Sequence, residues 1–337
     1  MIPASNDDRK PLRMVSCAAC GAKVFISGDL PPLSTTPCTK CGNPVMMPMR
    51  LRQFELRDAI ASGGMGTVYR AFDLMLEREV AVKLMRKELA EDTKSLENFY
   101  SEARACAALN HTNIIHIYTF DEIDGQLYLV MELADRGSLD QKIEQQGRLS
   151  ELQVLDIGIK VASALDTALK HNLLHRDIKP GNILFNAEGE PKLVDFGLAR
   201  STEADTEYDA AVWGTPYYIA PEKVKRERED FLSDMYSLAG TLYHALTGHV
   251  PFEAPTVEEV VAAHIHTLLT PPNQVLPEIT QPTSDGLMIA MAKIPAERYR
   301  TYDDFRMALE ASRSQLLISQ LRAKKETGTV GRSWWRR

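Results

Sequence analysis

From Phe54 onward, the first part of the chain alternates short apolar runs with turn residues. Such runs, bounded by Gly, Asp or Glu, are typical of β-strands. Residues 95–110 differ, because their apolar side chains recur along one stripe and predict an amphipathic helix. The expected strands are 54–60, 67–74, 78–85 and 127–133.

The second part of the chain has helical periodicity. Ser150 followed by Gln153 forms a capping-box signal, which predicts a helix that runs to about His171. Residues 233–247 and 302–317 also have the pattern of helices. A strand-rich part followed by a mostly helical part predicts an α+β fold of two lobes with a cleft between them.

The ends of the chain differ from this central region. We expect residues 1–16 to form a flexible N-terminal segment and residues 43–53 to form a linker. Residues 17–42 form a cysteine module with too few apolar residues to fold without a metal ion or another cross-link. Residues 313–337 form a basic tail with Trp334 and Trp335 near its end. We expect this tail to be a solvated end, with contact to an acidic or membrane surface as the alternative.

Composition narrows the functional class. The 337 residues are 44% hydrophobic and 25% charged, as in ordinary globular proteins. The net charge of −7 argues against a nucleic-acid partner, because phosphate binding needs clustered Lys and Arg. We expect no transmembrane segment, since no apolar run approaches about 18 residues. Residues 1–14 also lack the apolar core of a secretory signal, so we expect a cytoplasmic protein.

Four of the five cysteines fall into two Cys-x-x-Cys-Gly motifs, formed by Cys17, Cys20, Cys38 and Cys41. In a reducing cytosol such pairs favour metal ligation over disulfides, and the glycine eases the turn that brings two thiolates to one ion. The sequence therefore predicts a structural zinc site in a zinc-ribbon-like module. A protein-docking role is the preferred interpretation of this module, because Lys23 and Lys40 are too few for nucleic acid.

Two features of the strand-rich part fit a nucleotide phosphate. Residues 62–66 (SGGMG) would let backbone N–H groups approach phosphate oxygens, although for this motif taken alone a hairpin turn is the preferred interpretation. Lys83 lies inside an apolar strand and needs a charged partner. Glu102, on the inward stripe of the next helix, is suitable, and an ordinary structural ion pair is the alternative.

Two further motifs lie in the second part. In HRDIKPGN, residues 175–182, a carboxylate, a cation and an amide oxygen stand close together as Asp177, Lys179 and Asn182. Asp195 opens an Asp-Phe-Gly motif after another strand-like run, and it adds a hard oxygen ligand of the kind that Mg²⁺ prefers.

Together these motifs resemble the eukaryotic-type protein kinase family, over residues 54–312 and in the family's order. Ala220-Pro221-Glu222, Asp234 and Arg298 extend the match. The glycine-rich loop is most similar to the bacterial serine/threonine branch, and the lysine two residues after Asp177 agrees with Ser/Thr substrates.

The resemblance implies an ATP:protein phosphotransferase that uses ATP with Mg²⁺, or with Mn²⁺ in its place, acts on protein Ser/Thr hydroxyls and also phosphorylates itself. Lys83, held by Glu102, would orient the α- and β-phosphates. Asp177 would accept the hydroxyl proton or orient the nucleophile, and Lys179 would offset charge on the γ-phosphoryl group. Asn182 and Asp195 would hold the magnesium ion.

The resemblance also implies the nucleotide pocket. The loop itself would contribute Ala61, Ser62, Gly63, Gly64, Met65, Gly66 and Thr67. The adenine slot would be lined by Ile60, Val68, Ala81, Met131 and Leu184, with Glu132 and Leu133 as the hinge. A hydrophobic stack of the active state would consist of Cys106, Ile117, His175 and Phe196.

The sequence departs from the family pattern at two places. Ala61 replaces the first loop glycine, which should weaken nucleotide binding modestly. Glu207 and Asp209 stand where relatives often carry phosphorylated threonines that pair with the arginine at position 176. We hypothesise that these carboxylates partly replace the phosphate. The alternative is that they only solvate a flexible loop. Under either interpretation, Thr202, Thr206 and Thr215 are candidate phosphosites.

Two other functions compete with an active kinase: a pseudokinase that binds nucleotide without transfer, and a zinc-ribbon adaptor with a regulatory kinase domain. Retention of Lys83, Asp177, Asn182 and Asp195 argues against the pseudokinase.

Overall fold

The computed structural model describes residues 12–63, 66–86, 100, 103, 106–196 and 216–329, with side chains only up to position 322 in the last range. The chain forms two compact units, which are described one at a time. Unit 1 comprises Met1–Tyr100 and Ile117–Leu133, and unit 2 comprises Ser101–His116 and Ala134–Arg337.

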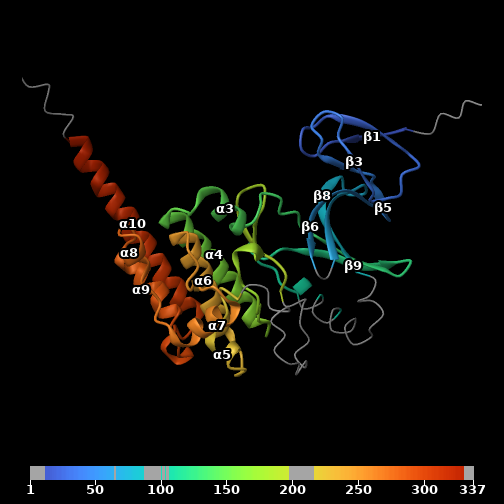
Figure 1. Ribbon diagram of the computed structural model, residues 1–337. Helices are drawn as coiled ribbons and strands as arrows, with labels where there is room; N and C mark the ends of the chain where they lie inside the picture. Colours follow the sequence, from blue (N-terminus) through green and yellow to red (C-terminus); the bar gives the residue numbers. More distant parts are fainter. Residues whose placement is uncertain are drawn as a thin grey trace, which may run out of the picture. The chain divides into compact units, whose positions relative to one another are not determined.

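The N-terminal part of unit 1 is a small module of two hairpins (Figure 1). Its own core consists of Cys17, Val24, Ile26, Cys38, Val45 and Met47. Its antiparallel strands are β1 (Leu12–Ser16) with β2 (Lys23–Ser27), and β3 (Thr35–Pro37) with β4 (Pro44–Met46).

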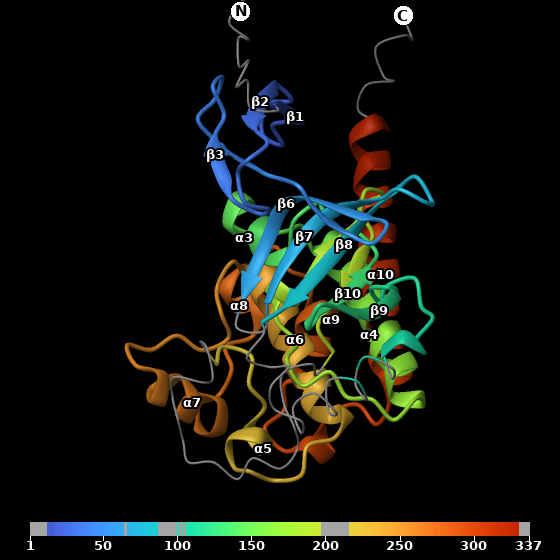
Figure 2. The ribbon, with the colours of Figure 1, turned by 90° about the vertical axis from the view of Figure 1, so that its right-hand side faces the viewer.

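The rest of unit 1 is a six-stranded sheet in the order β5-β6-β7-β8-β10-β9, whose strands β6, β7 and β8 lie side by side in Figure 2. All of its pairings are antiparallel. The four strands expected from the sequence are present, and β5 and β9 are additional. The strands are β5 (Met49–Leu51), β6 (Phe54–Gly63), β7 (Gly66–Asp73), β8 (Arg78–Met85), β9 (Ile117–Ile123) and β10 (Gln126–Met131).

Residues 43–53, expected to be a linker, carry β4 and β5 instead. Strand β5 pairs with β6 in register Met49↔Leu56 to Leu51↔Phe54, so this segment is an edge of the sheet. The linker prediction was wrong because it rested on a Met- and Pro-rich composition, whereas apolar residues of this segment are part of the sheet: Met46 and Leu51 are buried in the sheet core.

Unit 2 is mainly helical. Its helices are α3 (Leu139–Gln146), α4 (Glu151–Lys170), α5 (Pro221–Val224), α6 (Phe231–Thr247), α7 (Val257–His266), α8 (Pro272–Val275), α9 (Gln281–Ala290) and α10 (Tyr302–Thr329), with 3-10 turns η1 (Pro180–Asn182) and η3 (Pro295–Glu297). A hairpin of β11 (Ile183–Phe185) and β12 (Pro191–Leu193) precedes α5.

Helix α4 begins at the predicted capping box. The Ser150 side chain accepts from the Gln153 N–H, and the Gln153 side chain accepts from the Ser150 N–H at 3.1 Å. Helices α6 and α10 both pack against α4. Gly158 allows this approach, because a Cβ there would lie 2.7 Å from Leu242 and 3.0 Å from Leu309.

Helix α10 is longer than expected. The sequence predicted an end near Leu317, whereas the helix continues to Thr329 and so includes part of the segment expected to be a solvated tail. Arg313 joins α10 to α4 through an ion pair with Asp156 at 2.6 Å. In the described part of the chain, none of the helices combines the length and the apolar character needed to cross a bilayer.

Candidate functional site

Three side chains of loop 175–182 meet at one carboxylate in unit 2. Lys179 Nζ donates to Asp177 Oδ2 at 2.8 Å. Asn182 Nδ2 donates to the same oxygen at 3.1 Å and to the Asp177 carbonyl at 2.7 Å. The Asp177 side chain is 58% exposed, so this carboxylate remains accessible from solvent. The structure therefore brings together the three loop residues that the sequence singled out.

The backbone of this loop is fixed by Asp234 of α6. Its two carboxylate oxygens each accept one backbone N–H at 2.7 Å, from His175 and Arg176. Arg176 adopts a left-handed φ of 65°, which the two charge-assisted bonds hold in place. Lys223 Nζ donates to the Arg176 carbonyl at 2.7 Å. The loop conformation is thus set by the buried Asp234 of α6 and by Lys223 of α5.

His175 connects the loop to the Asp-Phe-Gly segment. Complete burial lowers the pKa of His175, so its ring is neutral and has one donor and one acceptor. Its Nε2 lies 2.9 Å from the Val194 carbonyl, and its Nδ1 accepts the Asp177 N–H at 3.3 Å. The Val194 N–H in turn donates to the Asn182 carbonyl at 3.0 Å. Asp195 follows directly, with φ of 57°.

Three members of the expected hydrophobic stack are buried together in unit 2. The rings of His175 and Phe196 have centroids 4.7 Å apart, and Cys106 Sγ lies 3.9 Å from the Phe196 carbonyl. Cys106 is 5% exposed and behaves as a small core residue. Ile117, the fourth expected member, belongs to unit 1.

A buried ion pair connects α5 to the residue that follows η3. Arg298 binds Glu222 through two parallel bonds of 2.7 and 2.8 Å, and Ser233 donates to the same carboxylate at 2.7 Å. Burial raises the pKa of Glu222, but the Arg298 guanidinium outweighs this effect and holds the pKa below its ordinary value. The structure thus pairs two of the residues, Glu222 and Arg298, that extend the family match in the sequence.

The sequence did not reveal how residues 216–222 are held on α6. Tyr218 OH lies 2.7 Å from His244 Nδ1, with the two rings stacked, and its carbonyl accepts from Ser237 Oγ at 2.8 Å. A Cβ at Gly240 would lie 3.7 Å from the Tyr218 ring. One sequence signal could have indicated this contact: small and polar residues recur along one face of the otherwise apolar helix α6. We call Ser233, Ser237, Gly240 and His244 the α6 stripe.

In unit 1, one face of the sheet carries Lys83. Strand register places Val68 opposite Lys83 and Met131 opposite Ala81. Because side chains alternate, these four share one face, and Tyr69, Val80 and Val82 point to the other face and form the sheet core. Lys83 is only 7% exposed. The structure thus places Val68, Ala81 and Met131, three of the expected adenine-lining residues, on the same face of the sheet as Lys83.

The glycine-rich segment joins β6 and β7. Gly63 pairs with Gly66, and Ser62 Oγ lies 3.1 Å from Thr67 Oγ1. Gly66 has no room for a side chain, because a Cβ would lie 2.0 Å from the Leu84 carbonyl oxygen of β8. Ile60, at 42% exposure, and Ala61 are exposed at the end of β6.

The remaining predicted residues fall into two groups. Glu132 and Leu133 are half-buried at the end of unit 1, and Leu184 is half-buried on β11 of unit 2. The others lie outside the described residues: Gly64, Met65, Glu102, Thr202, Thr206, Glu207, Asp209, Thr215, Trp334 and Trp335.

The four N-terminal cysteines form a cluster in which all sulfur atoms lie within 4.8 Å of one another. Two of the distances are 3.6 Å (Cys17–Cys41) and 3.8 Å (Cys20–Cys38). Four thiolates bound at about 2.3 Å around a tetrahedral zinc ion would be separated by about 3.8 Å, so the cluster fits this metal. The two loops are equivalent, with the N–H groups of Gly21 and Gly42 bonded to the first cysteine carbonyl of each motif.

The backbone N–H of Lys40 donates to Cys38 Sγ at 3.4 Å. This bond is the largest contribution to a lowered pKa of Cys38, and a lowered pKa favours the thiolate form that a metal ion binds.

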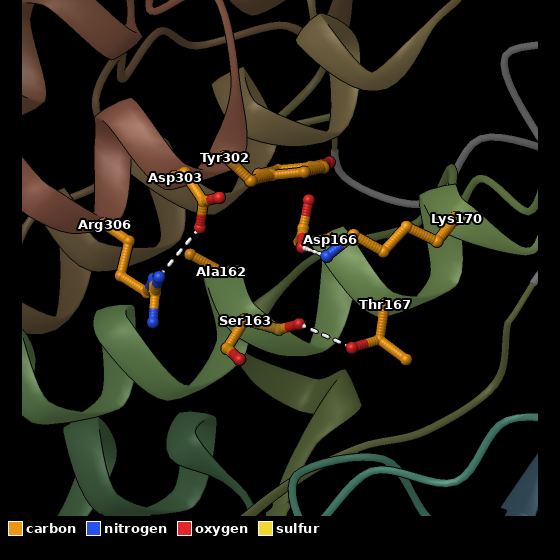
Figure 3. A pocket seen from close by; sticks show the side chains of 8 residues that line it. All are labelled: Ala162, Ser163, Asp166, Thr167, Lys170, Tyr302, Asp303 and Arg306. Atoms are coloured by element: carbon orange, nitrogen blue, oxygen red, sulfur yellow. Dashed lines mark hydrogen bonds and ion pairs between the residues drawn. The ribbon is translucent and has the colours of Figure 1, made fainter.

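A polar cavity of about 260 Å³ lies between α4 and α10 (Figure 3). Its charged side chains bind each other: Lys170 pairs with Asp166 at 2.6 Å, and Arg306 pairs with Asp303 at 2.8 Å. None of the motif residues lines it. This cavity is therefore separate from the candidate site.

Comparison with known proteins agrees with this geometry. Residues 54–317 match the family model described as the protein kinase domain. The serine/threonine-protein kinase PknA of Mycobacterium tuberculosis is 37% identical over 268 residues, which cover 78% of this chain and 62% of PknA. PrkC of Bacillus subtilis, another serine/threonine-protein kinase, is 33% identical over 75% of this chain and 39% of its own length.

The crystal structure of the PknI kinase domain of Mycobacterium tuberculosis is similar, with a TM-score of 0.61 and 25% identity. That likeness covers 78% of this chain and 97% of the PknI domain. The chain spans between 36% and 62% of the curated relatives PknA, PrkC and a probable serine/threonine-protein kinase of Clostridium perfringens. From the matched domain, the motifs and the fold, we conclude that this chain belongs to the protein kinase family, beside the bacterial serine/threonine kinases.

Proposed function

We propose that the chain is a serine/threonine protein kinase that transfers the γ-phosphate of ATP to protein hydroxyls and also phosphorylates itself. The observation that carries this proposal is the arrangement around Asp177, whose carboxylate is oriented by Lys179 and Asn182 on a loop anchored by Asp234. Such positioning matters most for phosphoryl transfer, where the protein contributes orientation and charge stabilisation.

In unit 2, each residue has a distinct role in the proposal. Asp177 accepts the proton of the attacking hydroxyl or orients that hydroxyl, and Lys179 offsets negative charge on the transferred group. The side-chain oxygen of Asn182 and the carboxylate of Asp195 are the hard ligands that would hold Mg²⁺ or Mn²⁺. A bound divalent ion would neutralise charge between the β- and γ-phosphates.

In unit 1, Lys83 would bind the α- and β-phosphates, with Glu102 as its carboxylate partner. The face that carries Lys83 also carries Val68, Ala81 and Met131, which supply an apolar surface for adenine. The close pairing of β7 with β8 at Gly66 supports a loop whose backbone N–H groups point at phosphate oxygens.

Retention of Lys83, Asp177, Asn182 and Asp195 favours a catalyst over a nucleotide-binding pseudokinase. The test is incubation of the purified chain with γ-labelled ATP, Mg²⁺ and a general acceptor protein, followed by identification of the phosphorylated residues. We expect phosphoserine and phosphothreonine. Asp177→Asn should lose the labelling, and Asp303→Asn, at an exposed position on α10, is the matched control. Equal labelling by the wild type and Asp177→Asn would reject the proposal.

We further propose that the four cysteines bind one zinc ion, because their sulfur separations match a tetrahedral thiolate site. The measurement is metal content per chain by mass spectrometry. One zinc per chain is expected for the wild type and none for Cys17→Ser with Cys38→Ser, which removes one thiolate from each motif.

The activation hypothesis concerns Glu207 and Asp209, which lie outside the described residues. Arg176, their proposed partner, has a buried Nε without a hydrogen-bond acceptor among the described groups. We expect phosphatase-treated enzyme to keep part of its activity, and Glu207→Gln with Asp209→Asn to reduce that remainder. Complete loss of activity on phosphatase treatment would reject carboxylate substitution.

A further inference from the structure

The cysteine module and the kinase sheet share the strand β4. Val45 and Met47 belong to the module core together with Cys17 and Cys38. Met46, between them, belongs to the sheet core instead. Since successive side chains of a strand point to opposite faces, β4 has one face in each core. All three residues are at most 4% exposed, so neither core is complete without this strand.

The loop between the two cysteine motifs adds a second connection. Leu33 packs against the sheet core, although it precedes β3 of the module. Its N–H donates to the Met47 carbonyl at 2.9 Å, and the Met47 N–H donates to the Ser34 carbonyl at 2.8 Å. Leu33 adopts a left-handed φ of 65°, which these bonds stabilise. These backbone hydrogen bonds therefore hold Leu33 in its contact with the sheet core.

The connection continues directly into the sheet. Strand β5 begins at Met49, three residues after β4 ends, and hydrogen-bonds to β6. Leu51 of β5 is 1% exposed in the same core as Met46. On the cysteine side, the Cys38 N–H bonds to the Asn43 carbonyl at 2.7 Å, immediately before β4. A short path of hydrogen bonds and packed side chains thus runs from the thiol cluster to the sheet that carries Gly66 and Lys83.

We propose that the cysteine module is a metal-dependent brace of the kinase sheet, so that zinc occupancy controls nucleotide binding. The module alone has a core of few residues, and such small cores need a metal or another staple to stay folded. When zinc leaves, β4 and the Leu33 loop lose their fixed positions, and the edge strand β5 loses its support. This inference rests on the proposed zinc site, and it assigns the module a role other than partner docking.

The first test uses the full chain and hydrogen exchange measured by mass spectrometry. Samples are compared as purified, after a zinc-selective chelator in excess Mg²⁺, and after zinc is added back. We expect chelation to speed exchange in residues 49–63 as well as in 12–47, and to weaken binding of an ADP–Mg²⁺ probe at least three-fold. Zinc should restore both. Faster exchange confined to 12–47, with nucleotide affinity unchanged, would overturn the brace.

The second test breaks the contact and leaves all four thiols in place. Met46→Ala and the milder Leu33→Ala should still bind one zinc per chain, yet exchange faster in 49–63 and bind nucleotide more weakly. In these variants, chelation should increase exchange in 49–63 and weaken nucleotide binding by smaller factors than it does in the wild type. Phe25→Ala is the matched control, since Phe25 is 65% exposed and belongs to neither core. An undiminished effect of chelation in both contact variants would reject the path through β4.

These results separate the brace from the kinase proposal. A chain that binds no zinc refutes the metal site and the brace together, and the Asp177→Asn labelling experiment still decides the kinase activity independently. Cysteine substitutions test the effect of zinc on the sheet more specifically than deletion of residues 1–50 would. The deletion removes part of β5, so it would disturb the sheet whether or not zinc matters.

Discussion

At the scale of single residues, the structure separates two glycines that the sequence presents as equivalent. A Cβ at Gly66 would lie 2.0 Å from the Leu84 carbonyl oxygen, whereas a Cβ at Gly63 would have no atom of the described residues within 4 Å. We expect Gly66→Ala to push β7 away from β8, which carries Lys83, and to weaken ADP–Mg²⁺ binding by about ten-fold. Gly63→Ala should have a smaller effect. Titration calorimetry on both variants checks this, and equal losses would contradict it.

The ion pair between Arg298 and Glu222 gives a prediction about pH. Removal of one partner of a buried pair costs about 3–5 kcal/mol of unfolding free energy, so Arg298→Ala should be strongly destabilising near neutral pH. In the wild type the lowered pKa of Glu222 contributes stability above the ordinary glutamate pKa, and this contribution is lost as the pH falls through the lowered value.

In Arg298→Ala the pKa shift of Glu222 changes direction. Without the guanidinium, burial raises the pKa of Glu222, so the folded state favours the protonated acid and gains relative stability as the pH falls. The loss of unfolding free energy should therefore be larger near pH 7 than near about pH 4.5. Urea unfolding at both pH values measures this difference. A loss that grows toward low pH would show that the pair does not set the ionisation of Glu222.

At the scale of elements, the α6 stripe connects one helix to the segment that leads into α5. The Tyr218 hydroxyl bonds to His244 at 2.7 Å, and a hydrogen bond of this kind contributes about 1 kcal/mol. Tyr218→Phe should therefore raise the amide exchange rate in residues 216–222 by about five-fold. Tyr217→Phe is the control, because no hydrogen bond of the Tyr217 hydroxyl is present among the described residues. Similar exchange in the two variants would contradict the role of His244.

Periodicity predicted the elements better than their partners. The capping box at Ser150 and the period-two runs of β6, β7 and β8 are local signals, and the structure has these elements. The Tyr218–His244 bond joins residues 26 apart, so no local pattern reveals it. Strand β5 was not predicted, because three residues are too few to show an alternation of apolar and polar side chains within a Met- and Pro-rich segment.

At the scale of the whole molecule, the family motifs predicted a kinase. How the cysteine module packs against the rest of the chain is visible only in the three-dimensional structure. Two Cys-x-x-Cys-Gly motifs indicate a metal site wherever they occur, and they do not show what the module packs against. The double use of β4, with Met46 in one core and its neighbours in the other, is a tertiary feature. In consequence, a segment expected to separate two domains joins them within one unit.

The central claim is that Asp177 serves transfer of the phosphoryl group, on a loop that Asp234 holds in place. The most direct test compares nucleotide affinity with the rate of γ-phosphate transfer to protein for the wild type and Asp177→Asn. The account predicts ADP–Mg²⁺ affinity within about two-fold and a transfer rate lower by roughly 10²–10⁴-fold. Transfer by Asp177→Asn at the wild-type rate, with nucleotide bound normally, would contradict it.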